Sequence, residues 1–560
     1  MKPQKEENRL RFVFYGSLIC LSVIQAWFTQ LMDDEAYYWV WSLKLDWGYF
    51  DHPPMAALLI KCGYLLFHNE FGVRLFSIII GVVSIYLMEK LIKPSDLKLF
   101  YAIVASVAVL HFGCFLAVPD VPLLFSSVLF FHAYKAYIKS QGALQICMVA
   151  LSVALLIYSK YMGALVIGFT LLSNVRLLKK GSFWLIILLF LALMMPHIMW
   201  QYSHDFPSLK YHWVERFTAP YEIADTLNYI IQQPFIFGPF MGVLFMYALF
   251  VFKPANVFER ALKVNAAGVY LFFLIMTSKG GAEGNWTMVT LVPMLYMGYK
   301  LAEQKVKLRK VVMFQLPVAM LLIAGVRVFL VYNFLPQKWT ENETFHDNKK
   351  WAKQIEQVAG DLPVAFMNSY QNASKYWFYS GHEAFVLNNA QGRKNQFTMW
   401  DSENEFQGKK VVVIANYETS YAKQIKSCKG VWTGYTIIDN FRSFGNIKIT
   451  PDRTYIKLKK GDSVTVKITM CYTNNNQRDF EANKEYAPCI SYIILKGANE
   501  DIAERIEQKV TNNMIDGRSE YPVTIYAPNA AGKYRVSVCI KVGWLPPGVN
   551  DNRIDLEVTE

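Results

Sequence analysis

Residues 32–55 read M-D-D-E-A-Y-Y-W-V-W-S-L-K-L-D-W-G-Y-F-D-H-P-P-M and directly follow the first long apolar run of the chain. This stretch holds five acidic residues, one histidine and seven aromatic residues at the point where a first membrane helix is expected to end. Placing charged groups at a lipid boundary costs desolvation free energy, so their concentration there indicates a functional site. The alternative is an interfacial belt of aromatic residues with solvated acids.

A helix over Asp34–Trp41 is expected in this stretch. In such a helix Asp34, Tyr37, Tyr38 and Trp41 stand at i, i+3, i+4 and i+7 and therefore share one face. The pattern predicts a carboxylate at the head of an aromatic stripe.

Along the whole chain, the composition changes once, from mainly apolar to mainly polar. The sequence has 560 residues and is 53% hydrophobic, and apolar runs about as long as a bilayer span recur up to Pro336. Charged and Asn-rich sequence follows, without a span-length apolar run. The formal net charge of +13 does not indicate nucleic-acid binding, because the Lys and Arg residues of the first part lie in short loops between apolar runs.

About eleven transmembrane helices are predicted in the part that ends at residue 336. The predicted spans are Phe12–Met32, Gly72–Met88, Leu99–Ala117, Val121–Tyr137, Leu144–Tyr158, Met162–Asn174, Phe183–Trp200, Phe235–Phe252, Val264–Thr277, Trp286–Met297 and Val311–Leu335. Basic clusters alternate between these spans and fall on one side, which the positive-inside rule makes cytoplasmic. An odd span count then places the N-terminus inside the cell and the C-terminal part outside.

Polar residues gather on the predicted outer side, and each has a plainer alternative. Asp120 is a candidate site residue or the N-cap of the fourth span, and Lys160 is a candidate phosphate ligand or a snorkelling lysine. His204 and Glu283 are candidates to line a ligand, or are solvated loop residues. Helices lying along the membrane surface are expected within Pro53–Phe67 and within Gln201–Gln233.

Five motifs resemble those of the multi-span glycosyltransferases that use polyprenyl-phosphate sugars. They are D-E-A-Y-Y-W, F-D-H-P-P-M, V-P-D-V-P-L-L, Y-S-K-Y-M-G and G-N-W-T, within about the first three hundred residues. The family includes protein O-mannosyltransferases and lipid A aminoarabinose transferases, of the glycosyltransferase family 39 and 83 type. The resemblance implies the C-type glycosyltransferase fold, an inverting transfer and a soluble domain on the outer face.

The resemblance also implies roles for individual residues. Asp34 matches the catalytic acid of the family, with Glu35 beside it. Lys160 matches a lysine near the donor phosphate, and Asp120 an acidic position in the same cavity. Where aminoarabinose-transferase-like members have E-K-P, this chain has Asp51, His52 and Pro53, so an always-charged lysine is replaced by an imidazole suited to hydrogen bonding.

The polar residues suggest a separate role for each in the transfer. Asp34 would be the general base, Glu35 and Asp51 would position hydroxyl groups, and Lys160 would neutralise the departing phosphate. His52, Tyr37 and Tyr38 are further candidate substrate contacts. The residues identify no definite cofactor, and Asp51, His52 and Glu35, which are of metal-ligand type, leave a divalent cation as an alternative.

The last third of the chain is expected to form two extracytoplasmic domains. Residues 337–450 alternate helix-like and strand-like segments, which favours a small α/β domain with a largely parallel sheet. Residues 451–560 alternate in strand fashion and predict a β-sandwich of immunoglobulin-like type, with a helical insert near Glu500–Lys509.

We therefore expect a polytopic α-helical membrane protein, with a transmembrane domain at 1–336, in a bacterial inner membrane. Its expected activity is glycosyl transfer from a polyprenyl-phosphate donor to a hydroxyl or phosphate of a lipid A, glycan or protein acceptor on the periplasmic face. A lipid-linked sugar transporter or flippase, and a non-catalytic glycan-binding membrane protein, are the alternatives.

Overall fold

The structure of the chain is a computed structural model. It describes residues 2–212, 221–280, 282–340, 343–415, 423–426, 428, 432–474, 476–478, 487–497, 500–543, 545–550 and 552–560. By its internal contacts the chain divides into two compact units, Met1–His346 and Asp347–Glu560.

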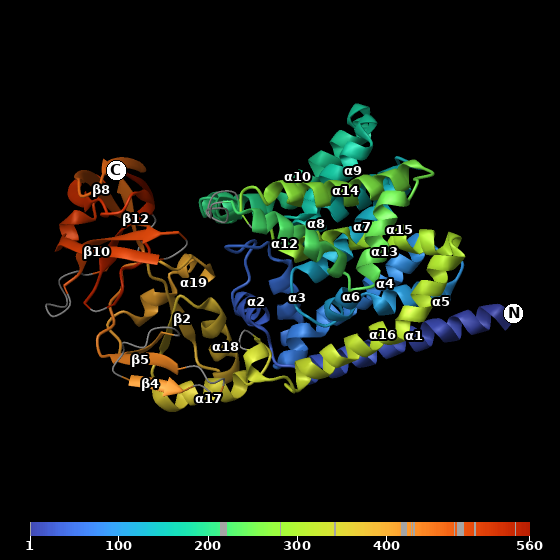
Figure 1. Ribbon diagram of the computed structural model, residues 1–560, viewed down its shortest axis with the longest axis horizontal. Helices are drawn as coiled ribbons and strands as arrows, with labels where there is room; N and C mark the ends of the chain where they lie inside the picture. Colours follow the sequence, from blue (N-terminus) through green and yellow to red (C-terminus); the bar gives the residue numbers. More distant parts are fainter. Residues whose placement is uncertain are drawn as a thin grey trace. The chain divides into compact units, whose positions relative to one another are not determined.

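The first unit is built from helices (Figure 1). In chain order they are α1 (Lys2–Phe28), α2 (Asp33–Leu43), α3 (Met55–Tyr64), α4 (Glu70–Ile92), α5 (Leu97–Ser106), α6 (Ala108–Gly113), α7 (Asp120–Tyr137), α8 (Ala143–Ser159), α9 (Gly163–Ser173), α10 (Gly181–Ser203), α11 (Pro207–Lys210), α12 (Ile223–Gln232), α13 (Met241–Val251), α14 (Val257–Met276), α15 (Leu291–Gln304) and α16 (Val306–Val331). Short 3₁₀ helices cover Val175–Lys179, Gln233–Phe235, Gly284–Thr290 and Gln337–Trp339.

Several of these helices are long and apolar enough to cross a membrane. Among the residues that the structure describes there are five: Gln4–Phe28, Glu70–Ile92, Gly181–Ser203, Val257–Lys279 and Val306–Val331. The prediction of a polytopic helical membrane domain is confirmed. The count of about eleven spans remains a prediction, since several of the other helices are too short to span alone.

The predicted span Leu99–Ala117 is interrupted, which corrects the prediction of one continuous helix. The backbone is extended at Val107, between α5 and α6. Polar side chains occupy the break: the hydroxyl of Ser106 donates to the carbonyl of Ala102 (2.8 Å) and accepts from the amide of Gln315 on α16 (2.9 Å). A broken helix is tolerated at membrane depth where such groups satisfy the backbone, and an apolar run does not reveal that support.

Two other predicted spans begin differently from the expectation. Phe235–Phe252 starts in a 3₁₀ turn, and its α-helix, α13, begins only at Met241. Trp286–Met297 starts within the 3₁₀ helix Gly284–Thr290, which leads into α15.

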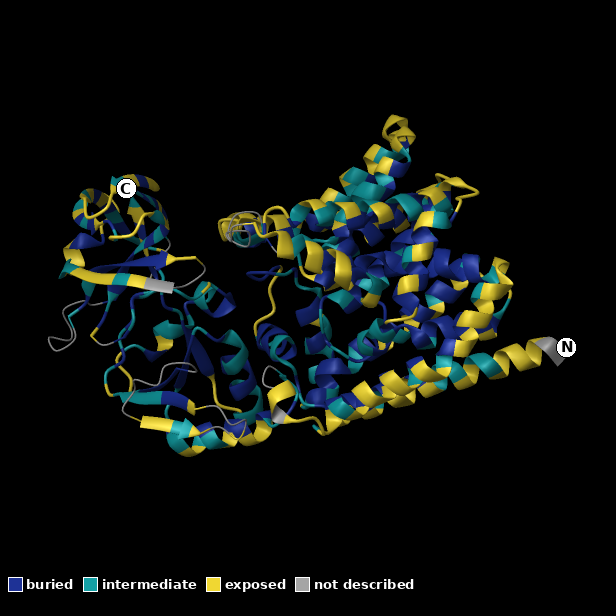
Figure 2. Ribbon diagram, viewed as in Figure 1, coloured by how far each residue is buried: buried dark blue, intermediate teal, exposed yellow. Residues whose placement is uncertain are grey.

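Helices α1 and α16 lie side by side and are tied together in the interior (Figure 1). The guanidinium of Arg327 on α16 donates to the carbonyl of Leu21 on α1 (3.2 Å), and the amide of Gln25 donates to the carbonyl of Arg327 (3.2 Å). Their outward faces are exposed and carry large apolar residues such as Phe12 and Phe314 (Figure 2). Such a surface is what a lipid-facing helix pair requires.

The first part of the second unit is an α/β layer. Its helices are α17 (Asn348–Ala359), α18 (Tyr370–Ser380) and α19 (Gln396–Met399), with a 3₁₀ helix at Ser402–Phe406, and its strands are β1 (Val364–Met367), β2 (Ala384–Leu387), β3 (Val411–Ala415), β4 (Lys423–Lys426) and β5 (Trp432–Ile438). The strand order is β2-β1-β3-β5-β4. The sheet is mixed, not largely parallel as predicted: β1 pairs in parallel with β2 and β3, but β5 runs antiparallel to β3 and β4.

The second part of this unit is a β-sandwich, as predicted. It contains β6 (Ile447–Pro451), β7 (Tyr455–Lys459), β8 (Ser463–Tyr472), β9 (Cys489–Lys496), β10 (Glu500–Lys509), β11 (Tyr521–Tyr526), β12 (Gly532–Lys541) and β13 (Ile554–Thr559), with a short 3₁₀ helix at Asn512–Met514. A five-stranded sheet, β10-β9-β12-β13-β7, and a three-stranded sheet, β11-β8-β6, share one apolar core. Strand β6 begins at Ile447, before the predicted boundary at residue 451.

The predicted helical insert at Glu500–Lys509 is wrong, because this segment is strand β10. It pairs antiparallel with β9, with register shifts between Asp501 and Ala503 and between Ile506 and Gln508. A β-bulge inserts a residue and resets the alternation of faces. The apolar residues Ile502, Ala503 and Ile506 therefore do not follow the alternation that marks the other strands of the sandwich.

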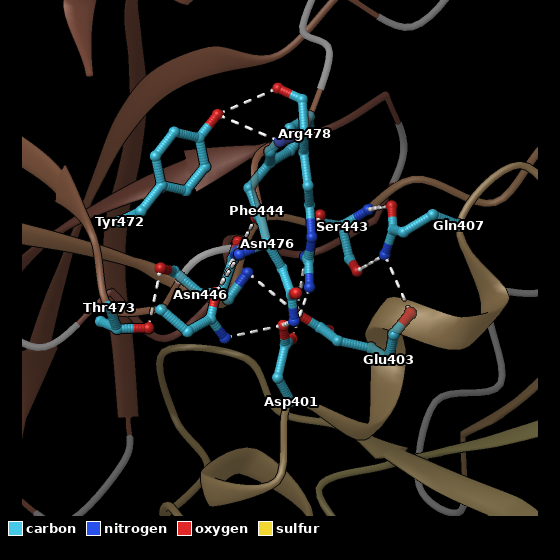
Figure 3. A network of polar contacts seen from close by, with 12 residues as sticks. Asp401, Glu403, Gln407, Ser443, Phe444, Asn446, Tyr472, Thr473, Asn476 and Arg478 are labelled. Atoms are coloured by element: carbon cyan, nitrogen blue, oxygen red, sulfur yellow. Dashed lines mark hydrogen bonds and ion pairs between the residues drawn. The ribbon is translucent and has the colours of Figure 1, made fainter. Parts of the chain in front are cut away.

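A buried arginine joins the α/β layer to the β-sandwich (Figure 3). The guanidinium of Arg478 donates to the carboxylates of Asp401 (2.5 Å) and Glu403 (3.0 Å) and to the carbonyl of Ser443. The amides of Asn474 and Asn476 donate to the second oxygen of Asp401 (2.9 and 3.0 Å). Because these contacts tie the Asn-rich loop after β8 to the turn after α19, the two parts form one unit.

Candidate functional site

The acidic stretch forms the first turn of helix α2, as the sequence predicts. Asp33, Asp34 and Glu35 occupy that turn, where the backbone N–H groups and the helix dipole favour negative charge. The carboxylate of Glu35 accepts from the backbone N–H of Met32 (3.2 Å), as in one half of a capping box. Asp34 is half-buried, whereas Glu35 is fully buried.

Glu35 is engaged on both oxygens by Arg74 of α4. The guanidinium donates through Nε to Oε1 (2.8 Å) and through Nη2 to Oε2 (2.5 Å), and both side chains have no exposed surface. The same guanidinium donates to the carbonyls of Ala26, Thr29 and Gln30 at the end of α1. Glu35 is therefore placed as a structural anchor, and not in the substrate contact that the sequence suggested.

This anchor also fixes the loop that precedes α7. The backbone N–H of Ala117 donates to Oε1 of Glu35 (2.9 Å), and Ala117 lies three residues before Asp120. The first turn of α2 and the V-P-D segment are thus held together. This hydrogen bond joins the residue after Asp34 to the loop that leads to Asp120.

The aromatic stripe of α2 is packed into the interior. The ring of Trp41 lies 4.8 Å from the rings of Tyr37 and Tyr38 and is stacked on Tyr49 at 4.6 Å. The hydroxyl of Tyr49 donates to the carbonyl of Trp41 (3.1 Å), so the loop after α2 folds back onto the helix. The predicted shared face is present, and its residues Tyr37 and Tyr38 are buried.

The D-H-P-P motif lies next to this stripe. The ring of His52 is 5.8 Å from Tyr38 and 6.4 Å from His212, and the imidazole of His212 is 3.0 Å from the carbonyl oxygen of Asp51. Asp51 is buried. Burial raises the pKa of the Tyr161 hydroxyl, and the nearby Asp51 carboxylate adds to this rise. The ring of His212 also lies 5.7 Å from the ring of Tyr161, so one histidine contacts both Asp51 and the turn that carries Lys160.

Tyr161 is the centre of a polar network that the sequence did not reveal. Its hydroxyl accepts from the amide of Gln201 (2.9 Å) and lies 3.2 Å from Nε2 of His197, both on α10. The Gln201 amide also donates to the hydroxyl of Ser208 (3.0 Å), which in turn donates to the carbonyl of Tyr49 (2.9 Å). The only signal in the sequence was the position of Tyr161 directly after Lys160.

Lys160 and Asp120 form an ion pair at the end of α8 and the start of α7. The ammonium of Lys160 lies 2.9 Å from each carboxylate oxygen of Asp120. The two side chains keep 11% and 18% of their surface exposed, respectively. Both predicted residues are therefore in one site, and the lysine charge is partly balanced while remaining within reach of a ligand.

The other two predicted residues, His204 and Glu283, are exposed. His204 stacks on Trp200 at 4.6 Å and is exposed at the end of α10. Glu283 is exposed and precedes the 3₁₀ helix Gly284–Thr290. Part of the Gln201–Gln233 loop, residues 213–220, lies outside the described residues.

Among the described residues, the D-H-P-P motif does not form a metal site. Across the described part of the chain, no three His, Cys, Asp or Glu side chains are grouped so that they could hold a metal ion. Glu35, one of the three candidate ligands, is already bound by Arg74.

Comparisons with known proteins bear on both sequence and fold. Residues 51–200 match the family model described as dolichyl-phosphate-mannose-protein mannosyltransferase. The lipid A galacturonosyltransferase RgtD of Rhizobium johnstonii is 22% identical over 282 residues, which are 47% of this chain and 59% of that protein. The chain thus matches less than two thirds of the length of that relative.

Solved structures share the fold. The apo crystal structure of ArnT from Cupriavidus metallidurans superposes with a TM-score of 0.54 at 12% identity, over 77% of this chain and 98% of that one. The structure of the same enzyme bound to undecaprenyl phosphate superposes with a TM-score of 0.53 at 12% identity, over 76% and 98%. The predicted C-type glycosyltransferase fold is confirmed, as is the resemblance to the polyprenyl-phosphate-dependent glycosyltransferases.

Proposed function

We propose that the chain is an integral membrane glycosyltransferase that moves a sugar from a polyprenyl-phosphate donor to a hydroxyl or phosphate acceptor. The observation that carries this proposal is the meeting of the first turn of α2 with the V-P-D loop through the Glu35–Ala117 hydrogen bond. That contact brings the region of Asp34 to the segment that holds the Asp120–Lys160 pair. The match to the mannosyltransferase family model and the fold shared with ArnT support the same reaction class.

The donor is proposed from the chemistry of Lys160. A phosphate linked to a sugar is a good leaving group once its developing charge is neutralised, and an ammonium supplies that charge. Asp120 would hold Lys160 in position until the phosphate binds. The likeness to an enzyme solved with undecaprenyl phosphate supports a polyprenyl-phosphate donor, and the likeness to a lipid A galacturonosyltransferase supports a lipid or glycan acceptor.

Asp34 is proposed as the general base. It is half-buried in a helical turn whose neighbour Glu35 is locked to Arg74, so its position is defined by a rigid anchor. Its carboxylate would remove the proton of an acceptor hydroxyl that attacks the anomeric carbon from the face opposite the phosphate. The carbon–phosphate-oxygen bond breaks as the new glycosidic bond forms, which inverts the anomeric centre.

The remaining predicted residues have secondary roles in the proposal. Asp51 and His52, with His212 beside them, would orient sugar hydroxyls, while Tyr37 and Tyr38 hold α2 in place. His204 and Glu283 stay candidates for contacts with the acceptor. The proposal includes no definite cofactor, keeps a divalent cation as the alternative, and includes no nucleic-acid partner.

The proposed location follows from the charge pattern. The basic clusters put the N-terminus in the cytoplasm and the Asp120–Lys160 end, together with the second unit, in the periplasm of a bacterium. At that face no nucleotide sugar is available, which fits a donor carried by a membrane lipid.

The test is Asp34→Asn in the full chain, with Asp33→Asn as a matched control in the same turn. We expect release of polyprenyl phosphate from a lipid-linked sugar to fall about 10²–10⁴-fold in Asp34→Asn, the contribution of one general base. Asp33→Asn should stay within a few-fold of wild type, and both variants should unfold at similar temperatures. Full activity of a folded Asp34→Asn protein would refute the assignment, and vesicles that translocate the donor without sugar transfer would indicate a transporter.

A further inference from the structure

A second polar site lies at the other end of the helical unit. Helix α7 begins at Asp120, in the proposed catalytic site, and Lys135 lies fifteen residues further along, about 22 Å away at 1.5 Å per residue. Lys135 lines a cavity of about 610 Å³ that is open to the surface. This volume falls in the range of ~300–1,000 Å³ that is usual for ligand pockets.

The lining of this cavity is strongly basic. Its cationic residues are Lys135, Lys139, Arg176 and Lys180, contributed by α7, the loop after it and the segment between α9 and α10. The amide side chains of Gln141, Asn174 and Asn256 add hydrogen-bonding groups.

The charges in this cavity are poorly balanced. Within the described part of the chain, Lys139, Arg176 and Lys180 form no ion pair, in contrast to Lys160 at the opposite end. Lys135 donates to the carbonyl of Leu91 (3.1 Å) and lies 4.9 Å over the ring of Phe258, and it is repelled by the charges of Lys93, Lys139 and Lys300.

One acid lies near the cavity but is already engaged. The carboxylate of Glu259 accepts from the hydroxyl of Tyr296 (3.1 Å) and from the backbone N–H of Ala255 (2.8 Å). Glu259 attracts Lys135, yet one acid does not offset four cations. An excess of positive charge in a cavity favours an anionic occupant.

The surroundings of the cavity are those of a membrane boundary. Lys180 directly precedes α10, whose outward face carries Trp184 (60% exposed) and Leu188 (63% exposed). The indole N–H of Trp184 donates to the carbonyl of Leu178, beside the cavity (3.1 Å). Tryptophan at a helix end with apolar residues beyond it is typical of the interface between headgroups and acyl chains.

We propose that this basic cavity binds a phosphate-bearing anion, with the headgroup of an anionic phospholipid as its source. Arg176 offers a fork of N–H donors that matches phosphate oxygens, and the three lysines add point charges. The acyl chains would then lie along the exposed apolar face of α10. Basic pockets between helices at a membrane face bind anionic headgroups in this way.

The experiment uses the full chain in phosphatidylcholine nanodiscs to which phosphatidylglycerol is added, with bound anionic lipid measured by native mass spectrometry. The variant Lys139→Gln/Arg176→Gln/Lys180→Gln should bind phosphatidylglycerol at least about tenfold more weakly, because it removes three of the four cations that line the cavity and would contact the headgroup phosphate. The matched control Lys305→Gln/Lys307→Gln/Lys310→Gln removes three exposed cations from the start of α16 and should bind as wild type does.

A competition arm separates the two sources of phosphate. If inorganic phosphate leaves the bound lipid in place, the occupant is a lipid headgroup, and if it displaces the lipid, the cavity accepts a soluble anion. If the triple variant does not fold, the exposed pair Lys139→Gln/Lys180→Gln is tested in its place. Unchanged lipid binding in the cavity variants, or an equal loss in the control, would overturn the proposal.

Discussion

Two carboxylate–cation pairs at the same end of the helical unit differ in burial. Glu35 and Arg74 have no exposed side-chain surface, and Arg74 makes further hydrogen bonds to three carbonyls. Lys160 and Asp120 form a somewhat longer pair, at 2.9 Å, and remain 11% and 18% exposed. A ligand cannot reach the fully buried Glu35–Arg74 pair, so we infer that this pair has a structural role. The Asp120–Lys160 pair is partly exposed, so a ligand can reach it.

Removal of Arg74 should have the largest effect on stability. In Arg74→Met the carboxylate of Glu35 is left buried without its cation, which costs about 3–5 kcal/mol. We expect a large fall in the apparent melting temperature, or no folded protein, for the detergent-purified chain. Lys98→Met breaks only the exposed pair with Glu6 and should change little. A melting temperature of Arg74→Met equal to that of wild type would show that the buried pair is not an anchor.

Arg478 extends the comparison to the second unit. Arg478→Met leaves Asp401 and Glu403 with less compensation, at a cost of about 3 kcal/mol, although Asn474 and Asn476 still donate to Asp401. Limited proteolysis of the full chain should then cut between the α/β layer and the β-sandwich faster than in wild type. The exposed pair of Arg453 and Asp452 supplies the control Arg453→Met, and equal cleavage rates in the two variants would contradict this expectation.

Lys160 should respond in the opposite way to Arg74. Lys160→Met should lower kcat/KM for the polyprenyl-phosphate donor about 10–100-fold, the value of one charge-assisted hydrogen bond, while the melting temperature falls less than in Arg74→Met because this pair is partly exposed. The measurement is donor dependence of sugar transfer at saturating acceptor. Lys210→Met removes a lysine from a more exposed aspartate pair and should leave kcat/KM for the donor unchanged. An unaltered kcat/KM in Lys160→Met would remove the phosphate role.

Tyr161 should show the smallest effect. Tyr161→Phe deletes the hydroxyl that contacts Gln201 and His197, and such a hydrogen bond contributes about 0.5–1.5 kcal/mol. We expect a loss of activity of a few-fold with a small drop in melting temperature. Tyr158→Phe, whose hydroxyl donates to the carbonyl of Leu193 at an exposed position, serves as the control. A loss as large as that of Asp34→Asn would mean that Tyr161 acts directly in the reaction.

Some elements were predictable because their signal is local. The acids of α2 precede an aromatic run at helical spacing, and both the helix and its stripe follow from that pattern. The strands of the β-sandwich alternate apolar and polar residues, and the sandwich over residues 451–560 is predicted from this alternation. Strand β10 was not predicted because two bulges interrupt its alternation, and these bulges arise from its pairing with β9.

The candidate site was predictable in residue type but not in role. Asp34, Asp120 and Lys160 were singled out as charges at predicted helix ends. Arg74 was missed, since a single arginine near the start of α4 gives no sign that it reaches α2 across 39 residues of sequence. The links from Tyr161 to α10 were missed for the same reason, because contacts between distant segments leave no periodic pattern.

The sequence by itself determined that the chain carries a membrane part built of apolar helices, a polar part rich in strands, and acids gathered at one helix boundary. These features follow from burial and periodicity, which each segment expresses on its own. Only the tertiary structure decided which charge is an anchor and which is open to a ligand. That distinction depends on the neighbours that exclude water from each side chain, and those neighbours come from helices far apart in the chain.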